Sequence, residues 1–376
     1  MVLYFCTCIV LFLGWLFSVI AKDKKLKTFV LIAVCLCFIA IMGFRNDITS
    51  DYSNYEILYF RINGYVETNG VFSVFTKSFY DAYLEPGYAL LNVLTKAVFN
   101  NVKWLFILSA ILIVLPIFLF AKQSKSPYFF LFLYVSLGTF FEGFNVMRQM
   151  IAASILLLGY KWVYEFKTGR IILITIVASL FHITSLSFIV FYLLFYAFAK
   201  LYEKKAYLNV PLLTAVMILI VFAITPLANW FIDVFKGGSY RYVEGITSMK
   251  MTNALFPVFV LVLVEIVASL FSGNQLELKK RFMILKEVNG CRVRSICQTG
   301  MYIWTALEIG VAQIPMVTRF ASFLSPYGLE YITENFALIR DKKTKRVVFT
   351  AFIVVLFAYK LIKISGTYLD GYQFSI

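Results

Sequence analysis

The sequence has little charge and almost no histidine for its length. Of its 376 residues, 15% are charged and one is a His, whereas 61% are apolar and 18% are aromatic. A soluble domain carries about 45–50% apolar and about 25% charged residues, so this composition excludes a water-soluble globular protein. We therefore predict an all-α, polytopic membrane protein that forms a single integral membrane domain over residues 1–376.

Several motifs of soluble enzymes are missing as well. The chain has no phosphate-binding loop, no HExxH zinc motif, no pair of CxxC motifs and no GxSxG nucleophile elbow. Nucleotide hydrolysis, zinc chemistry and α/β-hydrolase chemistry therefore lack support. The six Cys lie in apolar runs and in one basic loop, which indicates neither a disulfide framework nor a metal site. We expect no metal, no cofactor and no nucleic-acid partner.

Long apolar runs are the main structural signal, because about 17–25 apolar residues are enough to cross a bilayer. Clear runs are 3–20, 28–44, 104–121, 127–143, 146–164, 210–231, 254–271 and 347–364. Two longer stretches, 171–199 with His182 near its middle and 298–339 with Arg319 near its middle, are predicted to be helical hairpins. The eight clear runs and the two hairpins together predict about 12 transmembrane helices.

The distribution of basic residues supports the hairpins, because Lys and Arg accumulate in short cytoplasmic loops. With both hairpins present, the inside loops hold 23 of the 35 basic residues and 6 of the 20 acidic ones, and 272–297 is the longest of these loops. A single helix over 171–199 would place Arg170 and Lys200 on opposite sides of the membrane. Every later basic loop would then be inverted, so we favour the hairpin.

One long segment, 45–103, is left on the outer face. Within it, residues 86–101 place an apolar stripe opposite a polar one, which predicts an interfacial or re-entrant amphipathic helix. The apolar stripe contains Tyr88, Leu91, Leu94 and Val98.

A second helical face in this segment carries Tyr52, Tyr55 and Tyr59. This face is interpreted first as an interfacial aromatic belt and second as a surface on which sugar rings stack.

The polar residues that are able to do chemistry collect on the outer face. They are Arg45, Asp47, Asp51, Glu85, Glu142, Asn145, Arg148, His182, Arg241 and Arg319. The basic residues of the inside loops are mostly Lys, whereas Arg is preferred where a planar fork must hold phosphate or carboxylate. For a single Arg the alternative is a side chain that snorkels to lipid headgroups, and for His182 it is a kinked interfacial turn.

Two predicted helices begin beside these arginines. Asn145 is a candidate N-cap with Arg148 in the first turn, and Thr318 and Arg319 open another helix in the same way. A helix N-terminus favours anions, and an Arg there strengthens the site. Glu265 and Glu308 lie inside predicted spans and have no obvious partner in the sequence.

Six blocks of residues carry a resemblance to a known family. The blocks are FRNDITSDYSNY (44–55), EPGYALLN (85–92), FNVMRQMIAASILLLGYKW (144–162), SLFHITSLSF (179–188), SYRY (239–242) and TRF (318–320). In this order they resemble the EpsG family of Wzy-type polymerases, which build bacterial exopolysaccharide and capsule from lipid-linked repeat units. The resemblance spans about residues 45–320.

The resemblance implies an enzyme, a membrane glycosyltransferase of the bacterial cytoplasmic (inner) membrane whose active site faces outward. It would transfer an undecaprenyl-diphosphate-linked glycan to a sugar hydroxyl of another lipid-linked unit, in exopolysaccharide, capsule or O-antigen synthesis. The diphosphate linkage supplies the energy, so no cofactor is expected. Membrane lipids, a chain-length regulator and other polysaccharide export proteins are expected partners, and we expect a GT-C-like architecture.

Site residues follow from the chemistry together with the resemblance. The substrate-binding set, for diphosphate and sugar, is Arg45, Arg148, Asn145, Gln149, Arg241, Arg319, Glu85 and Tyr52. The general base that takes the proton of the attacking hydroxyl is sought, in this order, among His182, Glu142 and Asp51.

Other functions remain open at this point. A flippase or transporter of lipid-linked saccharides also needs Arg near diphosphate, but its polar groups should line a path through the spans. A glycosyltransferase with a monosaccharide phospholipid donor would use Asp47 and Asp51, with Mg²⁺ or Mn²⁺. A membrane acyltransferase with a catalytic His is a weaker alternative.

Overall fold

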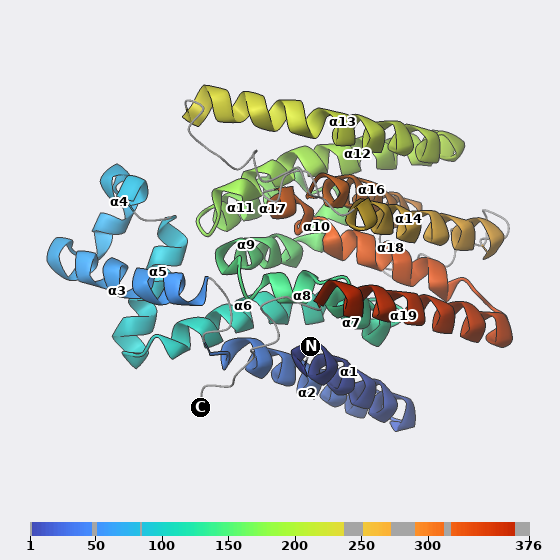
Figure 1. Cartoon of the computed structure of the whole chain (residues 1–376), viewed down its shortest axis with the longest axis horizontal. Coiled ribbons are helices and arrows are strands. Elements are labelled where there is room, and N and C mark those ends of the chain that lie inside the picture. The colour runs from blue at the N-terminus through green and yellow to red at the C-terminus, as the bar shows by residue number, and fades with distance from the viewer. Residues whose placement is uncertain are drawn as a thin grey trace. The chain divides into compact units, whose positions relative to one another are not determined.

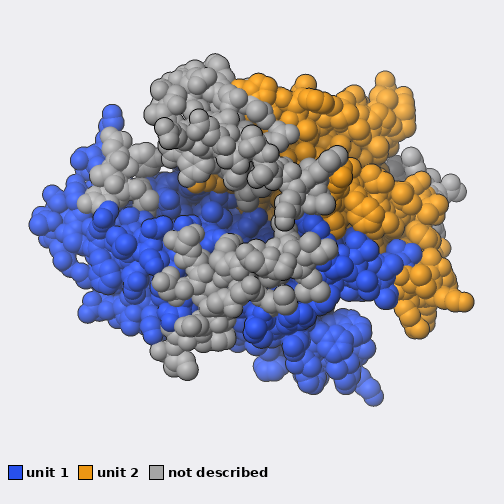
Figure 2. Space-filling model, viewed as in Figure 1, with its two compact units in different colours: residues 1–160, 168–186, 348–376 blue, residues 161–167, 187–347 orange. Residues whose placement is uncertain are grey.

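The computed structural model describes residues 2–46, 51–82, 85–236, 251–271, 290–311 and 317–364. Helix accounts for 87% of the structure, and no strand occurs in the described ranges, which confirms the all-α prediction. The chain divides into two compact units (Figure 2). Unit 1 contains Met1–Tyr160, Thr168–Leu186 and Val348–Ile376, and unit 2 contains Lys161–Lys167 and Ser187–Val347.

Several helices of unit 1 pack side by side. α2 packs on α1 and α6, α6 packs on α9, and α9 packs on α11 (Figure 1). The elements up to α11 are α1 (Val2–Ile20), α2 (Lys24–Gly43), α3 (Tyr52–Asn69), η1 (Val71–Phe75), α4 (Lys77–Ala82), α5 (Pro86–Phe99), α6 (Lys103–Ala121), α7 (Pro127–Ser136), α8 (Thr139–Glu142), α9 (Met147–Leu158), α10 (Tyr160–Tyr164) and α11 (Thr168–Ser179).

Unit 2 is arranged around α16, which packs against α12, α13, α14 and α18. α18 is buried along almost its whole length although it carries polar residues. The remaining elements of the chain are η2 (Ile183–Ser187), α12 (Phe188–Lys205), η3 (Ala206–Leu208), α13 (Asn209–Lys236), α14 (Met251–Phe271), α16 (Gly290–Val311), α17 (Thr318–Ala321), α18 (Ser325–Ala337) and α19 (Lys342–Ile364).

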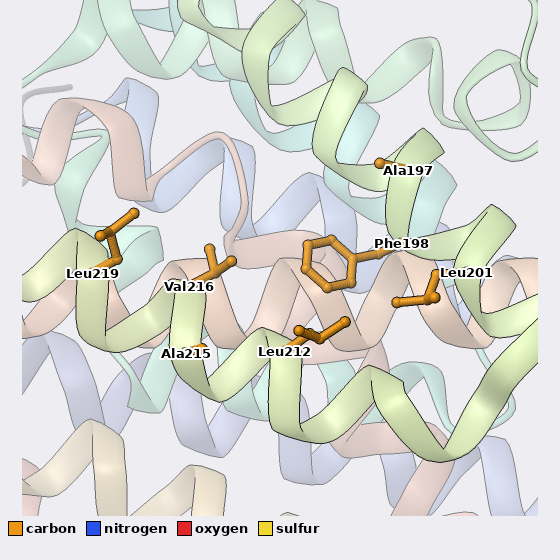
Figure 3. Close-up of a pocket in the computed structure, with 7 residues that line it drawn as sticks. All are labelled: Ala197, Phe198, Leu201, Leu212, Ala215, Val216 and Leu219. Atoms are coloured by element: carbon orange, nitrogen blue, oxygen red, sulfur yellow. The ribbon is translucent and has the colours of Figure 1, made fainter.

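An apolar groove of about 360 Å³ lies between α12 and α13 (Figure 3). Its walls carry no charged side chain, and they include Ala197, Phe198, Leu201, Leu212, Val216 and Leu219.

The described residues contain four helical stretches that are long and apolar enough to cross a membrane. They are Val2–Ile20, Lys24–Gly43, Lys103–Ala121 and Ile183–Ile224. Shorter apolar helices cover Pro127–Ser136, Met147–Leu158, Thr168–Ser179 and Leu255–Phe271. These helices agree with a membrane-embedded protein. The count of about 12 spans and the GT-C-like architecture stay predictions.

Several predicted spans are interrupted. The run 127–143 is split between α7 and α8, where Gly138 adopts a positive φ of 96° that other residues rarely tolerate. The run 146–164 is split between α9 and α10. Residues 171–199 do not form one continuous helix, because α11 ends at Ser179 and α12 begins at Phe188, with His182 in the break. The predicted interruption at His182 is therefore present.

The segment between α2 and α6 folds on itself. α3, η1, α4 and α5 share a small core that contains Ile62, Val66, Val74, Phe79 and Ala89. We call residues 51–99 the α3–α5 subdomain. The amphipathic helix predicted over 86–101 is present as α5, but its buried face differs from the predicted apolar stripe. Asn92 is buried and Leu94 is exposed.

Candidate functional site

Glu85 is the residue around which the candidate site is built. It directly precedes α5 and is only 5% exposed. Its Oε2 accepts a hydrogen bond from Nη1 of Arg148 at 2.6 Å, and its Oε1 lies 3.0 Å from Nδ1 of His182. Oε1 also accepts the backbone N–H of Ile183 at 3.2 Å. The structure thus brings together three of the residues that were predicted for the site.

The backbone of α5 explains why Glu85 meets His182. Pro86 starts the helix, and the N–H groups of Gly87 and Tyr88 both donate to the carbonyl of Leu180, at 2.8 and 3.3 Å. A Cβ atom on Gly87 would lie 2.7 Å from that carbonyl oxygen, so only glycine permits this approach. The first turn of α5 is therefore attached to the chain immediately before His182.

Arg148 reaches Glu85 from the first turn of α9, as the sequence predicted. Its side chain is 27% exposed, and it also interacts with Tyr55, whose ring lies edge-to-face with Tyr88 at 5.9 Å. The prediction that Asn145 caps this helix is wrong. The N-cap is Val146, with no side-chain cap hydrogen bond, because the helix begins only at Met147.

The charge state of Glu85 follows from its partners. Burial alone raises the pKa of its carboxyl, but the hydrogen bond from His182 and the charge of Arg148 outweigh burial and lower the pKa to about 2. An ionised carboxylate only accepts hydrogen bonds, so Nδ1 of His182 must be the donor. In the neutral ring Nε2 then carries the lone pair. Nε2 has no hydrogen-bond partner among the residues that the structure describes.

Arg45 is held inside the protein beside this cluster. It is 2% exposed, and its Nη1 donates to the carbonyl of Gly143 at 3.0 Å. Its guanidinium carbon lies 5.2 Å from the ring centre of Phe106 and 5.1 Å from that of Phe144. Arg45 therefore fixes the turn that leads into α9 and Arg148.

The remaining predicted residues of this turn lie close to Arg148 in the chain. Glu142 ends α8, and its carbonyl accepts the N–H groups of Asn145 at 3.0 Å and Val146 at 2.9 Å. Glu142 and Asn145 are half-buried, whereas Gln149 is buried.

Asp51 and Tyr52 lie at the start of α3. Asp51 is its half-buried N-cap residue and makes no side-chain cap hydrogen bond. Tyr52 stacks on Phe106 with ring centres 4.4 Å apart and an angle of 7°. Tyr52, Tyr55 and Tyr59 do share one helical face, as predicted, but that face is buried. It therefore forms neither an aromatic belt nor an open sugar-stacking surface in this structure.

The three remaining predicted residues belong to unit 2 or lie outside the described residues. Arg319 is half-buried in α17 of unit 2. Asp47 and Arg241 lie outside the described residues. Within the described ranges, no group of three or more His, Cys, Asp or Glu side chains is placed to hold a metal ion.

A second buried polar cluster occurs in unit 2. Glu265 accepts hydrogen bonds from Nε2 of Gln298 and from the hydroxyl of Tyr331, both at 3.0 Å. Gln298 in turn accepts one from Asn209 at 2.8 Å. Glu308 accepts one from the indole N–H of Trp304 at 3.0 Å. These contacts supply the partners that the sequence left unassigned for both glutamates.

Sequence reasoning placed Glu85 in the substrate-binding set and missed its contacts with two other site residues. It also missed Tyr88 as a neighbour of Tyr55. The available signal was the EPGY sequence, because a carboxylate followed by Pro and Gly indicates a helix start that is able to approach another backbone closely.

The fold and the site define an all-helical, membrane-embedded protein with a largely buried Glu–Arg–His cluster. The model of the EpsG family matches residues 28–374, and the chain belongs to the EpsG family. The resemblance carried by the six sequence blocks is thereby confirmed. The family points to an enzyme of exopolysaccharide biosynthesis, a polymerase. Comparisons with curated proteins and with solved structures returned no match.

Proposed function

We propose that the protein polymerises lipid-linked oligosaccharide repeat units on the outer face of the bacterial cytoplasmic membrane. The donor is a glycan on undecaprenyl diphosphate, and the acceptor is a sugar hydroxyl of a second lipid-linked unit. The observation that carries this proposal is the bonding of one carboxylate, Glu85, to both Arg148 and His182 in a chain of the EpsG family.

In this mechanism the acceptor oxygen bonds to the anomeric carbon of the donor while the bond from that carbon to the diphosphate oxygen breaks. Undecaprenyl diphosphate leaves with the electron pair, and the hydroxyl proton moves to Nε2 of His182. Arg148 stabilises the leaving diphosphate through charge-assisted hydrogen bonds. Glu85 orients the ring of His182, as a third group orients the catalytic base in other enzymes. It also accepts a hydrogen bond from the Arg148 guanidinium.

The other predicted residues take supporting roles. Arg45 is a positioning residue because its guanidinium is already enclosed by the protein. Asn145 and Gln149 support the Arg148 turn, and Arg241 and Arg319 stay sequence-based candidates for binding diphosphate. His182 ranks above Glu142 and Asp51 as the base, because the Glu85 carboxylate orients its ring.

One observation favours transport of lipid-linked saccharides as a second candidate function. The buried Asn209–Gln298–Glu265–Tyr331 network places polar groups among apolar helices of unit 2, where a transport path would need them. Polymerisation is preferred because a transporter has no need for a carboxylate-oriented His.

The test is the lipid-linked saccharide profile of cells that lack the protein and are complemented with variants. We expect single repeat units on the outer leaflet and no polymer without the protein, and polymer only with the wild type. Arg148→Lys keeps the charge but loses the fork, so polymer should fall by about 10-fold or more at a normal protein level.

Arg61→Lys is the matched control, because Arg61 is exposed on α3 and should tolerate the change. Full polymer from Arg148→Lys would rule out the diphosphate role of the fork. Repeat units trapped on the cytoplasmic leaflet would identify a transporter instead, and a truncated repeat would identify a monosaccharide transferase.

A further inference from the structure

The carboxyl-terminal half of α5 turns its apolar side outward. Leu94 is 60% exposed and Val98 is 69% exposed, whereas Asn92 and Thr95 on the other side are fully buried. The two buried polar side chains bond to backbone carbonyls of their own helix. A helix on the surface of a soluble domain shows the opposite arrangement, with apolar residues inside and polar residues in water.

The turn η1 repeats this arrangement in the same subdomain. Phe72 is 86% exposed, and its neighbours Val71 and Phe75 are also exposed, while Val74 points into the subdomain core. Single exposed apolar residues are common on proteins, but three in one five-residue turn form a concentrated apolar surface. Such a surface requires a nonaqueous neighbour.

Chain connectivity shows which neighbour is within reach. α5 ends at Phe99 and α6, which is long and apolar enough to cross a membrane, begins at Lys103. The Phe99 ring stacks on Trp104 with centres 4.2 Å apart and an angle of 12°. Trp and Tyr are enriched at the level of the lipid headgroups, where a span enters the membrane. Val98 directly precedes Phe99, and Leu94 lies five residues before it, about one and a half helical turns, so both lie close to the start of this span.

We propose that the exposed stripe of α5 (Leu94 and Val98) and the η1 turn (Val71, Phe72 and Phe75) form a membrane-docking surface inserted at the boundary between lipid headgroups and acyl chains. The occupant is membrane phospholipid. Hydrocarbon contact stabilises the inserted side chains as it does in interfacial amphipathic helices.

The docking surface has a consequence for the site, and this step rests on the proposed function. Glu85 directly precedes the same helix, and Gly87 attaches that helix to the chain before His182. Docking of α5 therefore sets the position of the Glu85, Arg148 and His182 cluster along the membrane normal. The cluster is held near the headgroup layer, where the diphosphate of a lipid-linked substrate must lie.

The first test is photo-crosslinking of the full-length protein in vesicles of phosphatidylethanolamine and phosphatidylglycerol. Phe72→p-benzoylphenylalanine and Leu94→p-benzoylphenylalanine should each give adducts with the mass of one phospholipid. Glu67→p-benzoylphenylalanine is the control in the same subdomain, because Glu67 is an exposed polar residue that pairs with Lys96, and it should give clearly fewer lipid adducts. Adducts to a second copy or to another protein, or lipid yields no higher than the control, would overturn the docking surface.

This readout needs no saccharide chemistry, so it separates failure of the docking surface from failure of the proposed function. The effect of docking on the position of the cluster is tested by Leu94→Asp. This variant should lower polymer yield by about tenfold, because a carboxylate resists insertion into the membrane. Leu94→Phe should retain the wild-type yield. Normal polymer from Leu94→Asp at an equal protein level would show that docking does not position the cluster, and it would leave the docking surface itself standing.

Discussion

Each oxygen of the Glu85 carboxylate has a different partner, and the two partners come from distant parts of the chain. Oε2 holds Arg148 and Oε1 holds His182, at sequence separations of 63 and 97 residues. Loss of the carboxylate charge therefore affects the base and the anion-binding group together. Residues that act as such a unit do not have additive effects on rate.

A double-mutant cycle tests this unit at the residue scale. His182→Ala should lower the polymerisation rate by about 10²–10⁴-fold, the usual contribution of a general base. Glu85→Gln should cause a loss of similar size, because it removes the charge that orients the ring. The double variant should be no slower than the slower single variant, as measured with purified enzyme and lipid-linked repeat units.

Variants of the other base candidates complete this experiment. Glu142→Gln and Asp51→Asn should retain most of the activity. If either of them abolished polymerisation while His182→Ala did not, the base would be that carboxylate. Multiplicative losses in the double variant would mean that Glu85 and His182 act independently.

At the scale of elements, the approach of α5 to the segment before His182 depends on one residue. The Gly87 N–H bonds the Leu180 carbonyl, and the space beside it is too small for a Cβ atom. The Glu85–His182 distance is consequently controlled by helix packing and not by the two side chains alone.

Gly87→Ala should separate the first turn of α5 from Leu180. Overpacking of this kind costs about 1–3 kcal/mol, so both the thermal midpoint in detergent and the polymerisation rate should fall. Gly64→Ala is a matched control, because a Cβ there meets nothing within 4 Å and alanine favours the helix. A Gly87→Ala protein with wild-type stability and rate would show that the close approach is not required.

At the scale of the whole molecule, the depressed pKa of Glu85 links stability to pH. The folded value is about 2 and the ordinary value is 4.5, so the unfolded state binds the proton more readily. The stabilising contribution is complete above the ordinary value and is lost as the pH falls from there toward 2. It amounts to about 3 kcal/mol.

Unfolding in detergent measured from pH 7 down to pH 3 should show this loss in the wild type. Glu85→Gln has no proton to bind at this position, so its stability should be lower at pH 7 and should change less with pH. Parallel curves for the two proteins would mean that Glu85 is not held ionised in the folded state.

The sequence by itself determined the class of protein, its apolar helices, the helix predicted over 86–101 and the family. Composition and periodicity are local properties of the chain, so they are readable without knowing how the helices pack. Arg148, His182 and Glu85 were selected on the same basis, from residue type and family blocks. Their separate positions along the chain carried no information about which of them meet.

Only the tertiary structure decided that Glu85 joins Arg148 to His182, that Arg45 is enclosed by Phe106 and Phe144, and that the tyrosines of α3 face inward. Contacts between residues far apart in the chain depend on how whole helices pack. The orientation of α5 shows a further limit. Its periodicity predicted one apolar stripe at the membrane interface, but lipid and protein core are both apolar environments. Packing divides that stripe, because Tyr88 is buried in the protein whereas Leu94 is exposed.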